Sequence, residues 1–231
     1  MSTALLNGLR QTFDALEENR DVRVVVVRGA GKAFCSGMDL DEMKARQDAQ
    51  ADPEANVVEV LQTIERSRHP TIAMIQGDAF AGGCELALHC DLRVVADVAR
   101  FAMPLARIGL IVPFTLGQKI VEIVGPAHAR EILLTGLPID ARRAREMGMA
   151  HEVAPAAELE TRTYALARTI AGHAPQSLAG MKAVIRRAIS LRERIESADL
   201  DETARRARKS EDAREGVRAM LEKRPPNFRG A

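Results

Sequence analysis

The sequence predicts an α/β fold followed by a helical region, and three observations support this prediction. Short β-branched segments alternate with segments of helical periodicity as far as about Leu137, which is typical of strands joined by right-handed helical crossovers. From about Asp140 the sequence becomes charged and amphipathic. The chain has 231 residues, of which 46% are hydrophobic, and is long enough to bury one large core. We therefore expect a core domain at residues 1–140 and a helical region at residues 141–231.

The N-terminal part is predicted to contain a helix, a buried strand and a second, short helix. Apolar side chains repeat at helical spacing at Leu5, Leu6, Leu9, Phe13 and Leu16. Residues 22–28 are β-branched and end at Gly29, which indicates a strand. The short helix begins at about Asp39. Residues 47–56 are acidic, rich in alanine and without apolar periodicity, so we expect a mobile loop of the kind that often covers a pocket.

The middle of the chain continues the alternation of helices and strands. In order, the pattern predicts a helix at 57–67, a strand at 71–76, a glycine-bearing turn at 77–83, a helix ending at His89 and a strand at 92–96. Residues 101–113 are apolar and resemble a loop. Helices are expected at 115–124 and 126–134, the second with Pro126 in its first turn. In the last third, helices are expected to break at Pro155, Pro175 and residues 197–201 and to pack on a neighbouring surface.

Composition excludes several classes of function. Lys and Arg number 33 and Asp and Glu 32, so the net charge is +1 and no long-range field favours a nucleic acid or an acidic membrane. The longest apolar runs are far shorter than the roughly 20 residues that cross a bilayer, and the first residues do not resemble a signal peptide. The three cysteines include no CxxC pair, which disfavours a disulfide framework and a zinc site. We expect a cytoplasmic protein with neither a nucleic-acid nor a membrane partner and no bound metal.

Two segments place glycine and small residues at a turn that leads into a helix. Residues 33–40 read Ala-Phe-Cys-Ser-Gly-Met-Asp-Leu, and residues 79–86 read Ala-Phe-Ala-Gly-Gly-Cys-Glu-Leu. Helix N-termini present unpaired N–H groups and a partial positive charge. If the turns converge, one N–H from each could hold a carbonyl oxygen that becomes negative during a reaction. For either segment alone, glycine that merely permits a turn and close packing is the alternative.

These segments resemble the crotonase (enoyl-CoA hydratase/isomerase) family. The first is similar to the family pattern Ala-Phe-small-Ser/Ala-Gly-x-Asp-Leu and the second to Gly-Gly-Cys-Glu-Leu-Ala-x-x-Cys-Asp. The resemblance covers nearly the whole chain and continues in residues 100–104, 108–111 with Gln118, 134–136, 144–153, 210–216 and 222–228. It implies a ββα spiral followed by a C-terminal helical trimerisation region, assembled as a homotrimer or a dimer of trimers.

The resemblance also implies roles for individual residues. The backbone N–H groups of Met38 and Gly82 would form an oxyanion hole, and Glu85 would be a catalytic glutamate acting as acid or base on water or an α-proton. A glutamate that merely complements the helix dipole is the alternative for Glu85. The substrate would be an acyl-CoA thioester, with coenzyme A as part of the substrate and no separate cofactor. Further contacts to substrate or CoA would come from Lys32, Ala33, Ser36, Gly37, Asp39, Leu40, Gly83, Pro104, Leu105 and Gly109.

The chain departs from the family pattern at two places. Hydratases of the family read Pro-Glu where this chain has Pro104-Leu105, and leucine cannot transfer a proton. The family's first strand and its Arg-Pro/Asn-Ala segment, which helps to hold CoA, are absent before Ser2. Two further features leave alternatives open. Arg107 either faces the pocket or is a solvated surface residue. Glu85 and His89 lie at i and i+4 on one helix, and this pair is more typical of a core histidine than of a metal site.

The best interpretation of these residues is hydration of a 2-enoyl-CoA, with Glu85 as acid and base. The alternatives are an acyl-CoA isomerase, hydrolase or decarboxylase, since the same oxyanion hole would serve each of them. A catalytically weak acyl-CoA-binding homologue is a further alternative, because Leu105 replaces the second glutamate. The sequence disfavours a serine hydrolase, because Ser36 is not in a Gly-x-Ser-x-Gly elbow and no His–Asp partner can be nominated for it. The glycine segments also lack the Lys-Ser/Thr of a P-loop.

Overall fold

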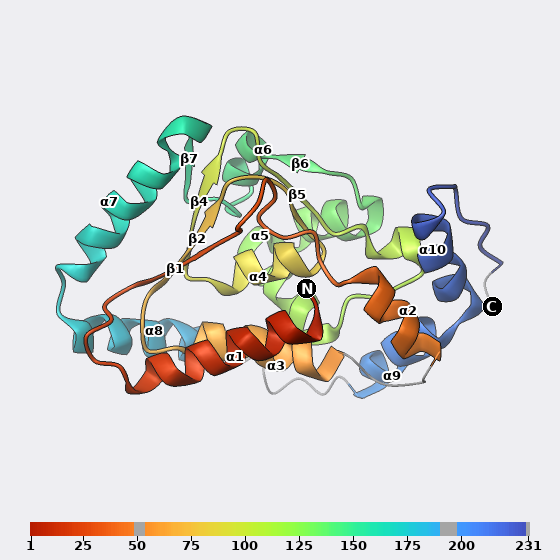
Figure 1. Ribbon diagram of the computed structural model, residues 1–231, viewed down its shortest axis with the longest axis horizontal. Helices are drawn as coiled ribbons and strands as arrows, with labels where there is room; N and C mark the ends of the chain where they lie inside the picture. The colour runs from red at the N-terminus through yellow and green to blue at the C-terminus, as the bar shows by residue number, and fades with distance from the viewer. Residues whose placement is uncertain (49–53, 190–197, 230–231) are drawn as a thin grey trace.

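The computed structural model describes residues 1–48, 54–189 and 198–229 (Figure 1). The N-terminal elements are α1 (Thr3–Glu18), β1 (Val25–Arg28), α2 (Leu40–Asp48), α3 (Glu54–Arg66), β2 (Thr71–Ile75), β3 (Ala79–Phe80) and α4 (Gly82–His89). The middle contains β4 (Leu92–Ala96), β5 (Arg100–Ala102), the 3₁₀ helix η1 (Pro104–Ile108), α5 (Phe114–Thr135), β6 (Ile139–Asp140) and α6 (Ala141–Glu146). The rest comprises β7 (Glu152–Ala154), the 3₁₀ helix η2 (Ala156–Glu158), α7 (Leu159–Ala171), α8 (Pro175–Ile189), α9 (Ala198–Lys209) and α10 (Glu211–Leu221).

The main sheet has four parallel strands in the order β1-β2-β4-β7. Every residue of β2 is buried, as expected for a central parallel strand that is covered on both faces. A smaller sheet has the order β3-β5-β6, with β3 parallel and β6 antiparallel to β5. The fold is therefore the mixed α/β arrangement that the sequence predicts.

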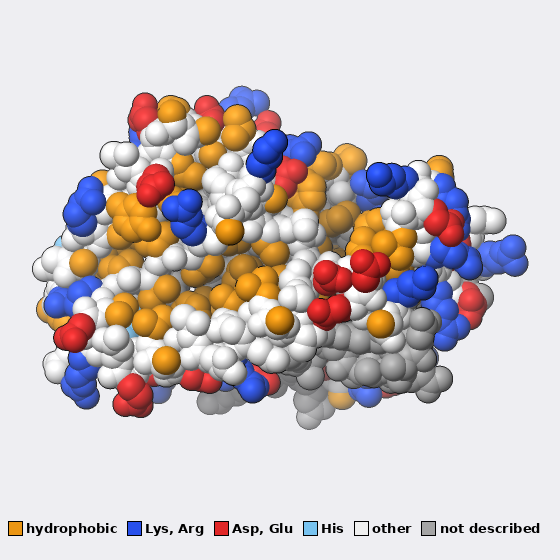
Figure 2. Space-filling model, viewed as in Figure 1, with side chains coloured by type: hydrophobic (Ala, Val, Ile, Leu, Met, Phe, Trp, Pro, Cys, Tyr) orange, Lys and Arg blue, Asp and Glu red, His pale blue; other side chains and the backbone are white. Residues whose placement is uncertain are grey.

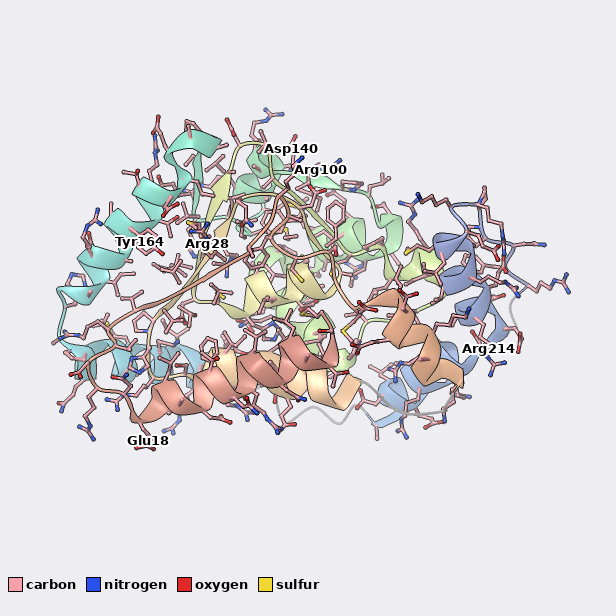
Figure 3. All side chains as sticks on the ribbon, viewed as in Figure 1. Glu18, Arg28, Arg100, Asp140, Tyr164 and Arg214 are labelled. Carbon is pink, nitrogen blue, oxygen red and sulfur yellow. The ribbon has the colours of Figure 1, made fainter. Side chains whose placement is uncertain are left out.

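Helix α4 is the most deeply buried helix among those described, and it positions the site. Every residue from Gly83 to His89 is buried, because α4 contacts α3, α5 and β3. At one end of the molecule α2, α9 and α10 lie together, while α7 lies at the opposite end, where Arg28 of β1 reaches Glu160 at 3.7 Å (Figures 1 and 3). Figure 3 also shows Arg100 beside Asp140, its partner in the register of β5 and β6.

The C-terminal helices are joined to the core by a close backbone contact. Helix α10 contacts η1, α2 and α9. A Cβ atom on Gly216 of α10 would lie 2.5 Å from the Cα atom of Ile108, so glycine is required for this approach. Through this contact the position of η1, and of the pocket wall that η1 supplies, depends on the C-terminal region.

Several element predictions are confirmed, and others need correction. The break between two helices within α5 is confirmed at Gly125, whose φ of 71° and ψ of 169° are not helical. The predicted loop at residues 101–113 instead contains part of β5 and η1, and the predicted turn at 77–83 contains β3. These segments are too short to show a period. Of the predicted loop at 47–56, residues 49–53 lie outside the described residues, while its flanks belong to α2 and α3.

One strand lies within the region that was predicted to be helical. Strand β7 pairs with β4 through Val94↔Glu152 and Val95↔Val153. The sheet therefore extends beyond the predicted boundary at residue 140. The sequence did not predict this strand, because β7 is only three residues long and shows no alternation of apolar and polar residues. The predicted breaks at Pro155 and Pro175 coincide with the starts of η2 and α8.

Helix α8 exposes an apolar face. None of its residues is buried, and Met181, Val184 and Ile185 are 62%, 69% and 63% exposed. Orange side chains also gather on the visible face of the molecule between α7 and α1 (Figure 2). Among the described helices, none is both long and apolar enough to cross a membrane.

Candidate active site

The two glycine-bearing turns converge. Cys35 forms an isolated parallel bridge with Ala79, and the N–H of Phe80 donates to the carbonyl of Cys35 at 2.9 Å. A Cβ atom on Gly83 would lie 2.0 Å from the Cys35 carbonyl oxygen, so no other residue fits there without a backbone shift. The backbone of the first turn thus packs directly on the start of α4.

The next residues of each turn bring two backbone N–H groups together. Gly37 is buried with φ of +100°, and a Cβ atom on Gly82 would lie 3.7 Å from the Gly37 Cα atom. Within the described part of the chain, the N–H groups of Met38 and Gly82 have no backbone acceptor. Both residues line the same cavity. The predicted oxyanion-hole donors are therefore neighbours, and both are available to a ligand.

The turn before α4 has an unusual backbone. Ala81 has φ of 48° and ψ of −120°, a conformation that residues other than glycine rarely adopt. Its N–H donates to the carbonyl of Ala102 at 2.8 Å, which ties the turn to β5. The side chain of Met1 packs over Gly82, and its amino group donates to the carbonyl of Gly37. Strained backbone of this kind is often found at functional sites.

The cavity beside these donors has a volume of about 80 Å³. Its walls come from α2, α3, α4, η1, α5 and α9, so both the core and the C-terminal region contribute. The residues that line it are Met38, Met43, Val57, Val58, Gly82, Glu85, Met103, Leu105, Leu110, Val112, Pro113, Leu116 and Arg208. Apart from one carboxyl and one guanidinium group, these side chains are apolar or absent, as is typical of a ligand pocket.

Glu85 supplies the carboxyl group. It lies in the first turn of α4, its side chain is 1% exposed, and neither carboxyl oxygen has a hydrogen-bond partner among the described residues. Burial raises the pKa of the Glu85 carboxyl well above its ordinary value, and the positive charge of Lys119 opposes this only in part. The buried group is therefore favoured in its protonated form and can donate a proton to a ligand.

His89 lies one helical turn after Glu85 and is also buried. Its Nδ1 donates to the Glu85 carbonyl at 2.8 Å, whereas the Glu85 Oε2 atom is 3.8 Å from Nδ1. Burial lowers the pKa of His89 to about 4, so the ring is neutral near pH 7. The pair contacts no further candidate ligand, since the described residues include no group of three or more His, Cys, Asp or Glu suited to a metal. His89 is a core histidine bonded to its own helix.

Comparison with known proteins identifies the family. The family model described as "Enoyl-CoA hydratase/isomerase" matches residues 1–231. The chain belongs to the enoyl-CoA hydratase/isomerase family. A "Probable enoyl-CoA hydratase" of Bacillus subtilis is 33% identical, with 100% of this chain and 90% of the relative covered. The "2,3-dehydroadipyl-CoA hydratase" of Escherichia coli is 30% identical, with 100% and 90% covered.

Solved structures of the family share the fold. A methylmalonyl-CoA decarboxylase complexed with 2S-carboxypropyl-CoA superposes with a TM-score of 0.89 at 26% identity, covering 99% of this chain and 89% of that chain. A putative enoyl-CoA hydratase from Mycobacterium avium paratuberculosis superposes with a TM-score of 0.84 at 33% identity, covering 98% and 88%. The crotonase fold predicted from the sequence is thereby confirmed.

Leu105 lines the pocket, at the position where the family resemblance implies a glutamate in hydratases. It is the second residue of η1, and it shares the cavity with Glu85. The described lining therefore contains one carboxyl group. Arg107, two residues later, is exposed and packs its side chain near Gly136, with Cδ 3.5 Å from the position of a Cβ there. It is a surface residue and does not line the pocket.

Other residues that the family resemblance singles out lie around the pocket without lining it. Lys32, Ala33 and Ser36 are exposed, on the turn that precedes Met38. The Ala33 carbonyl accepts a hydrogen bond from the Gln76 side chain at 2.9 Å, which fixes this turn on the end of β2. Contact between Lys32 and a CoA phosphate stays a prediction.

The remaining predicted residues have evident structural functions. Asp39 caps α2 by accepting from the N–H groups of Asp41 and Glu42 at 3.1 and 3.0 Å, and Leu40 is the first residue of that helix. Gly109 has φ of +69° and packs on α10, where a Cβ atom would lie 2.8 Å from the Ala213 nitrogen. Pro104 begins η1, and its Cα lies 3.1 Å from the position of a Cβ on Gly136.

Sequence reasoning missed most of the apolar wall and the one cation among the described residues of the lining. Val57 and Val58 of α3 were assigned to a helix but not to a pocket, and Leu110 and Leu116 were assigned to an apolar loop and helix. Arg208 lies in a run of charged residues on α9 that resembles a solvated face. The sequence gives no sign that Arg208, rather than a neighbouring charged residue, lines the pocket, because only the packing of α9 against the core decides which face of the helix lies there.

Proposed function

We propose that this chain binds an acyl-CoA thioester in the cavity beside α4 and stabilises the enolate that forms next to the thioester carbonyl. The observation that carries the proposal is the placement of Glu85. Its buried carboxyl, without a hydrogen-bond partner in the described structure, lines the same cavity as Met38 and Gly82, whose N–H groups have no backbone acceptor there. Two donors for the developing oxyanion and one group for the proton are the minimum that this chemistry needs.

We further propose that the reaction is hydration of a 2-enoyl-CoA. The N–H groups of Met38 and Gly82 donate to the thioester oxygen as water adds at the β-carbon and negative charge moves to the oxygen. The protonated Glu85 gives its proton to the α-carbon, and its carboxylate takes a proton from the attacking water. One water molecule is consumed and Glu85 ends as it began. The apolar wall strengthens these interactions because it excludes bulk water.

The relatives support hydration as the first candidate. Several of the curated relatives at 30% identity or more carry the name enoyl-CoA hydratase, and another is named for 2,3-dehydroadipyl-CoA. Leu105 opposes rapid hydration, since a second carboxyl would otherwise share the transfer of protons. A positioned acid or base contributes about 100-fold to 10,000-fold to a rate, so we expect slow but measurable hydration.

A panel of acyl-CoA thioesters tests the proposal. Purified protein is incubated with crotonyl-CoA, trans-2-hexenoyl-CoA, trans-3-hexenoyl-CoA, butyryl-CoA and methylmalonyl-CoA, and the products are identified by mass and chromatography. Addition of one water to the 2-enoyl thioesters, absent with Glu85→Gln, is the expected result. A shifted double bond would indicate isomerisation and free CoA would indicate hydrolysis. Tight thioester binding with no product would indicate an acyl-CoA-binding protein without the proposed activity.

Decarboxylation is a second candidate that the pocket favours. Loss of CO₂ from a malonyl-type thioester leaves an enolate directly, so the protein must supply an oxyanion hole and one proton donor. Glu85 in its protonated form is such a donor, and the apolar Leu105 adds no second charged group beside the substrate carboxylate. The similarity to a solved methylmalonyl-CoA decarboxylase agrees with this candidate. Conversion of methylmalonyl-CoA to propionyl-CoA in the panel would establish it in place of hydration.

We also propose that the chain assembles as a homotrimer or a dimer of trimers in a reducing cytoplasm. The support for assembly is the apolar face of α8, where Met181, Val184 and Ile185 are more than 60% exposed. The support for the location is that all three cysteines are free thiols. Light scattering of the wild type and of Val184→Asp tests the assembly. A monomeric wild type at micromolar concentration would contradict it.

A further inference from the structure

Three arginines line a small cleft that is separate from the cavity beside α4. The cleft has a volume of about 20 Å³ and lies where the end of α1, the start of β1, the end of α3 and the start of α8 meet (Figure 1). The residues that line it are Arg20, Val22, Arg23, Arg68, His69, Pro70, Pro175 and Leu178. This described lining contains no Asp or Glu, so it carries a net positive charge.

The three guanidinium groups have few acceptors within the protein. Arg23 donates through Nη2 to the His173 carbonyl at 2.7 Å, and its Nε atom is buried without a hydrogen-bond partner in the described structure. The guanidinium groups of Arg20 and Arg68 form no ion pair or hydrogen bond with any described residue. A buried donor without an acceptor costs free energy, and like charges held at one cleft repel one another. An anion in the cleft would relieve both costs.

Neither Glu17 nor a helix end occupies these guanidinium groups. The Glu17 carboxylate accepts from the backbone N–H of Arg68 at 2.8 Å, so it binds the main chain of this segment. Cations that follow a helix often complement the helix dipole. At the end of α1, however, the Leu16 carbonyl already accepts from the Asn19 N–H at 3.0 Å and from Nε2 of His69 at 2.8 Å. The arginines are therefore not needed to satisfy this helix end.

The first turn of α8 adds the positive end of a 15-residue helix. Pro175 has no N–H group, and the N–H groups of Gln176 and Ser177 have no backbone acceptor in the described part of the chain. Unpaired N–H groups and the partial positive charge of a helix N-terminus favour an anion. Arginines from three separate segments and a helix N-terminus thus meet at one cleft.

We propose that this cleft binds a phosphate group, either as the free ion or at the end of a small organic molecule. A tetrahedral phosphate presents acceptors in several directions, which suits donors that come from separate segments, whereas a planar carboxylate matches a single guanidinium fork. The volume of the cleft suits one such group and is too small for a nucleobase or an acyl chain. Bound phosphate would connect the ends of α1 and α3 to α8, a helix of which no residue is buried.

The cleft and the cavity beside α4 lie toward opposite edges of the main sheet. Arg23 and Pro70 precede β1 and β2, whereas both glycine-bearing turns follow these strands. Because β1 and β2 are parallel, the segments before them lie at one edge of the sheet and the segments after them at the other. The phosphate site is therefore distinct from the site proposed for the thioester, and this inference does not depend on the proposed function.

Calorimetric titration of the whole chain with inorganic phosphate, at an ionic strength held constant with sodium chloride, tests the inference. Wild type should show a single saturable site. Arg68→Met should weaken binding by about 10-fold to 100-fold, as for a hydrogen-bonded charge, and Arg20→Met by less, because Arg20 is exposed. Neither substitution removes a guanidinium contact to a described residue, so both variants should fold.

Arg66→Met is the matched control. Arg66 also lies at the end of α3, but it is exposed, contacts the Gln62 side chain at 3.3 Å and does not line the cleft. Its loss should change the phosphate affinity by less than about 3-fold, because an exposed charge is screened by salt. Equal weakening by Arg66→Met and Arg68→Met would show a general effect of surface charge and overturn the inference.

Glycerol 3-phosphate and acetate distinguish the sources of the anion. Tighter binding of glycerol 3-phosphate than of inorganic phosphate would assign the cleft to the terminal phosphate of an organic ligand. Tighter binding of inorganic phosphate would assign it to the free ion, and either result supports the inference. Acetate that binds as tightly as phosphate would overturn it.

Hydrogen exchange locates the bound ion. Phosphate should slow amide exchange in residues 172–178 of wild type and leave it unchanged in Arg68→Met. Wild type without saturable phosphate binding would overturn the inference, as would competition between phosphate and butyryl-CoA, which would place the ion at the thioester site. Loss of an oligomer in Arg68→Met, in a protein that binds no phosphate, would assign the arginines to a contact between subunits and also overturn it.

Discussion

Glu85 of α4 and Glu215 of α10 are both buried helical glutamates, and their surroundings are opposite. Their residues are 1% and 9% exposed. No group of the described structure donates to the carboxyl of Glu85. Glu215 accepts from Arg224 at 2.6 and 3.0 Å, from Arg218 at 2.6 Å and from the Asn227 N–H at 3.0 Å. The first carboxyl faces a cavity, and the second ties the C-terminal tail to α10.

The surroundings shift the two pKa values in opposite directions. Burial raises the pKa of Glu85, whereas hydrogen bonds from Arg224 and Arg218 hold the pKa of Glu215 well below its ordinary range. Burial alone therefore does not mark a catalytic group. A carboxyl whose partners are missing from the protein, and which lines a cavity, is suited to exchange a proton with a ligand. A carboxyl with every oxygen occupied stabilises a fold.

The largest effect is expected for Glu85→Gln. The variant keeps the size of the side chain but removes the transferable proton, so acyl-CoA turnover should fall by about 100-fold to 10,000-fold. The free energy of unfolding near neutral pH should stay the same or rise, because no hydrogen bond to the carboxyl is lost. Steady-state kinetics and urea denaturation measure both quantities. Turnover within a few-fold of wild type would remove Glu85 from the mechanism.

A gain of about 10-fold or more in crotonyl-CoA hydration is expected for Leu105→Glu. This substitution places a second carboxyl in the cavity that Glu85 lines, where hydratases of the family have one. The new group lies against apolar residues and its own pKa will rise, so rates are measured from pH 6 to 9 together with stability. A well-folded variant that hydrates no faster at any of these pH values would show that Leu105 is shaped for another reaction.

Glu215→Gln should affect the C-terminal tail and leave chemistry at the pocket nearly intact. The charge that holds Arg218 and Arg224 is removed, so residues 222–229 should be cleaved faster by trypsin while the core resists. Glu211→Gln is a matched control, because that residue is exposed and pairs with Arg214 within the same helix. Equal cleavage rates in the two variants would contradict the structural role given to Glu215.

The smallest effect is a pair of opposite slopes of stability against pH. A raised pKa means that the folded state binds more protons than the unfolded state above the ordinary glutamate value of about 4.3. Wild type should therefore lose stability relative to Glu85→Gln as pH rises through this window, by up to about 1.4 kcal/mol per pH unit. Glu215 should act in the other direction, because its pKa is lowered in the folded state. Its contribution to the free energy of unfolding is present above the ordinary glutamate pKa and is lost as the pH falls below that pKa. Denaturation curves at pH 3, 5 and 8 compare the variants, and parallel pH profiles would contradict both assignments.

Short-range patterns in the sequence predicted much of the site. Gly37 belongs to one local motif, and Gly82, Gly83 and Glu85 belong to a second, so short patterns in the sequence predicted both turns and Glu85. The pocket wall was not found, because Val57, Leu110 and Arg208 come from separate elements that meet only after folding. The strand β7 was missed for the same reason, since its three residues become a strand only by pairing with β4.

Exchange of an α-proton in D₂O reports formation of the proposed enolate, whichever reaction follows. Butyryl-CoA is incubated with the protein, and deuterium at the α-carbon is followed by mass spectrometry. Wild type should incorporate deuterium well above the buffer rate, and Glu85→Gln should lose this activity while binding butyryl-CoA with similar affinity. If wild type binds the thioester but incorporates deuterium no faster than buffer, the pocket does not form an enolate with Glu85 as its base, and the proposed function is wrong.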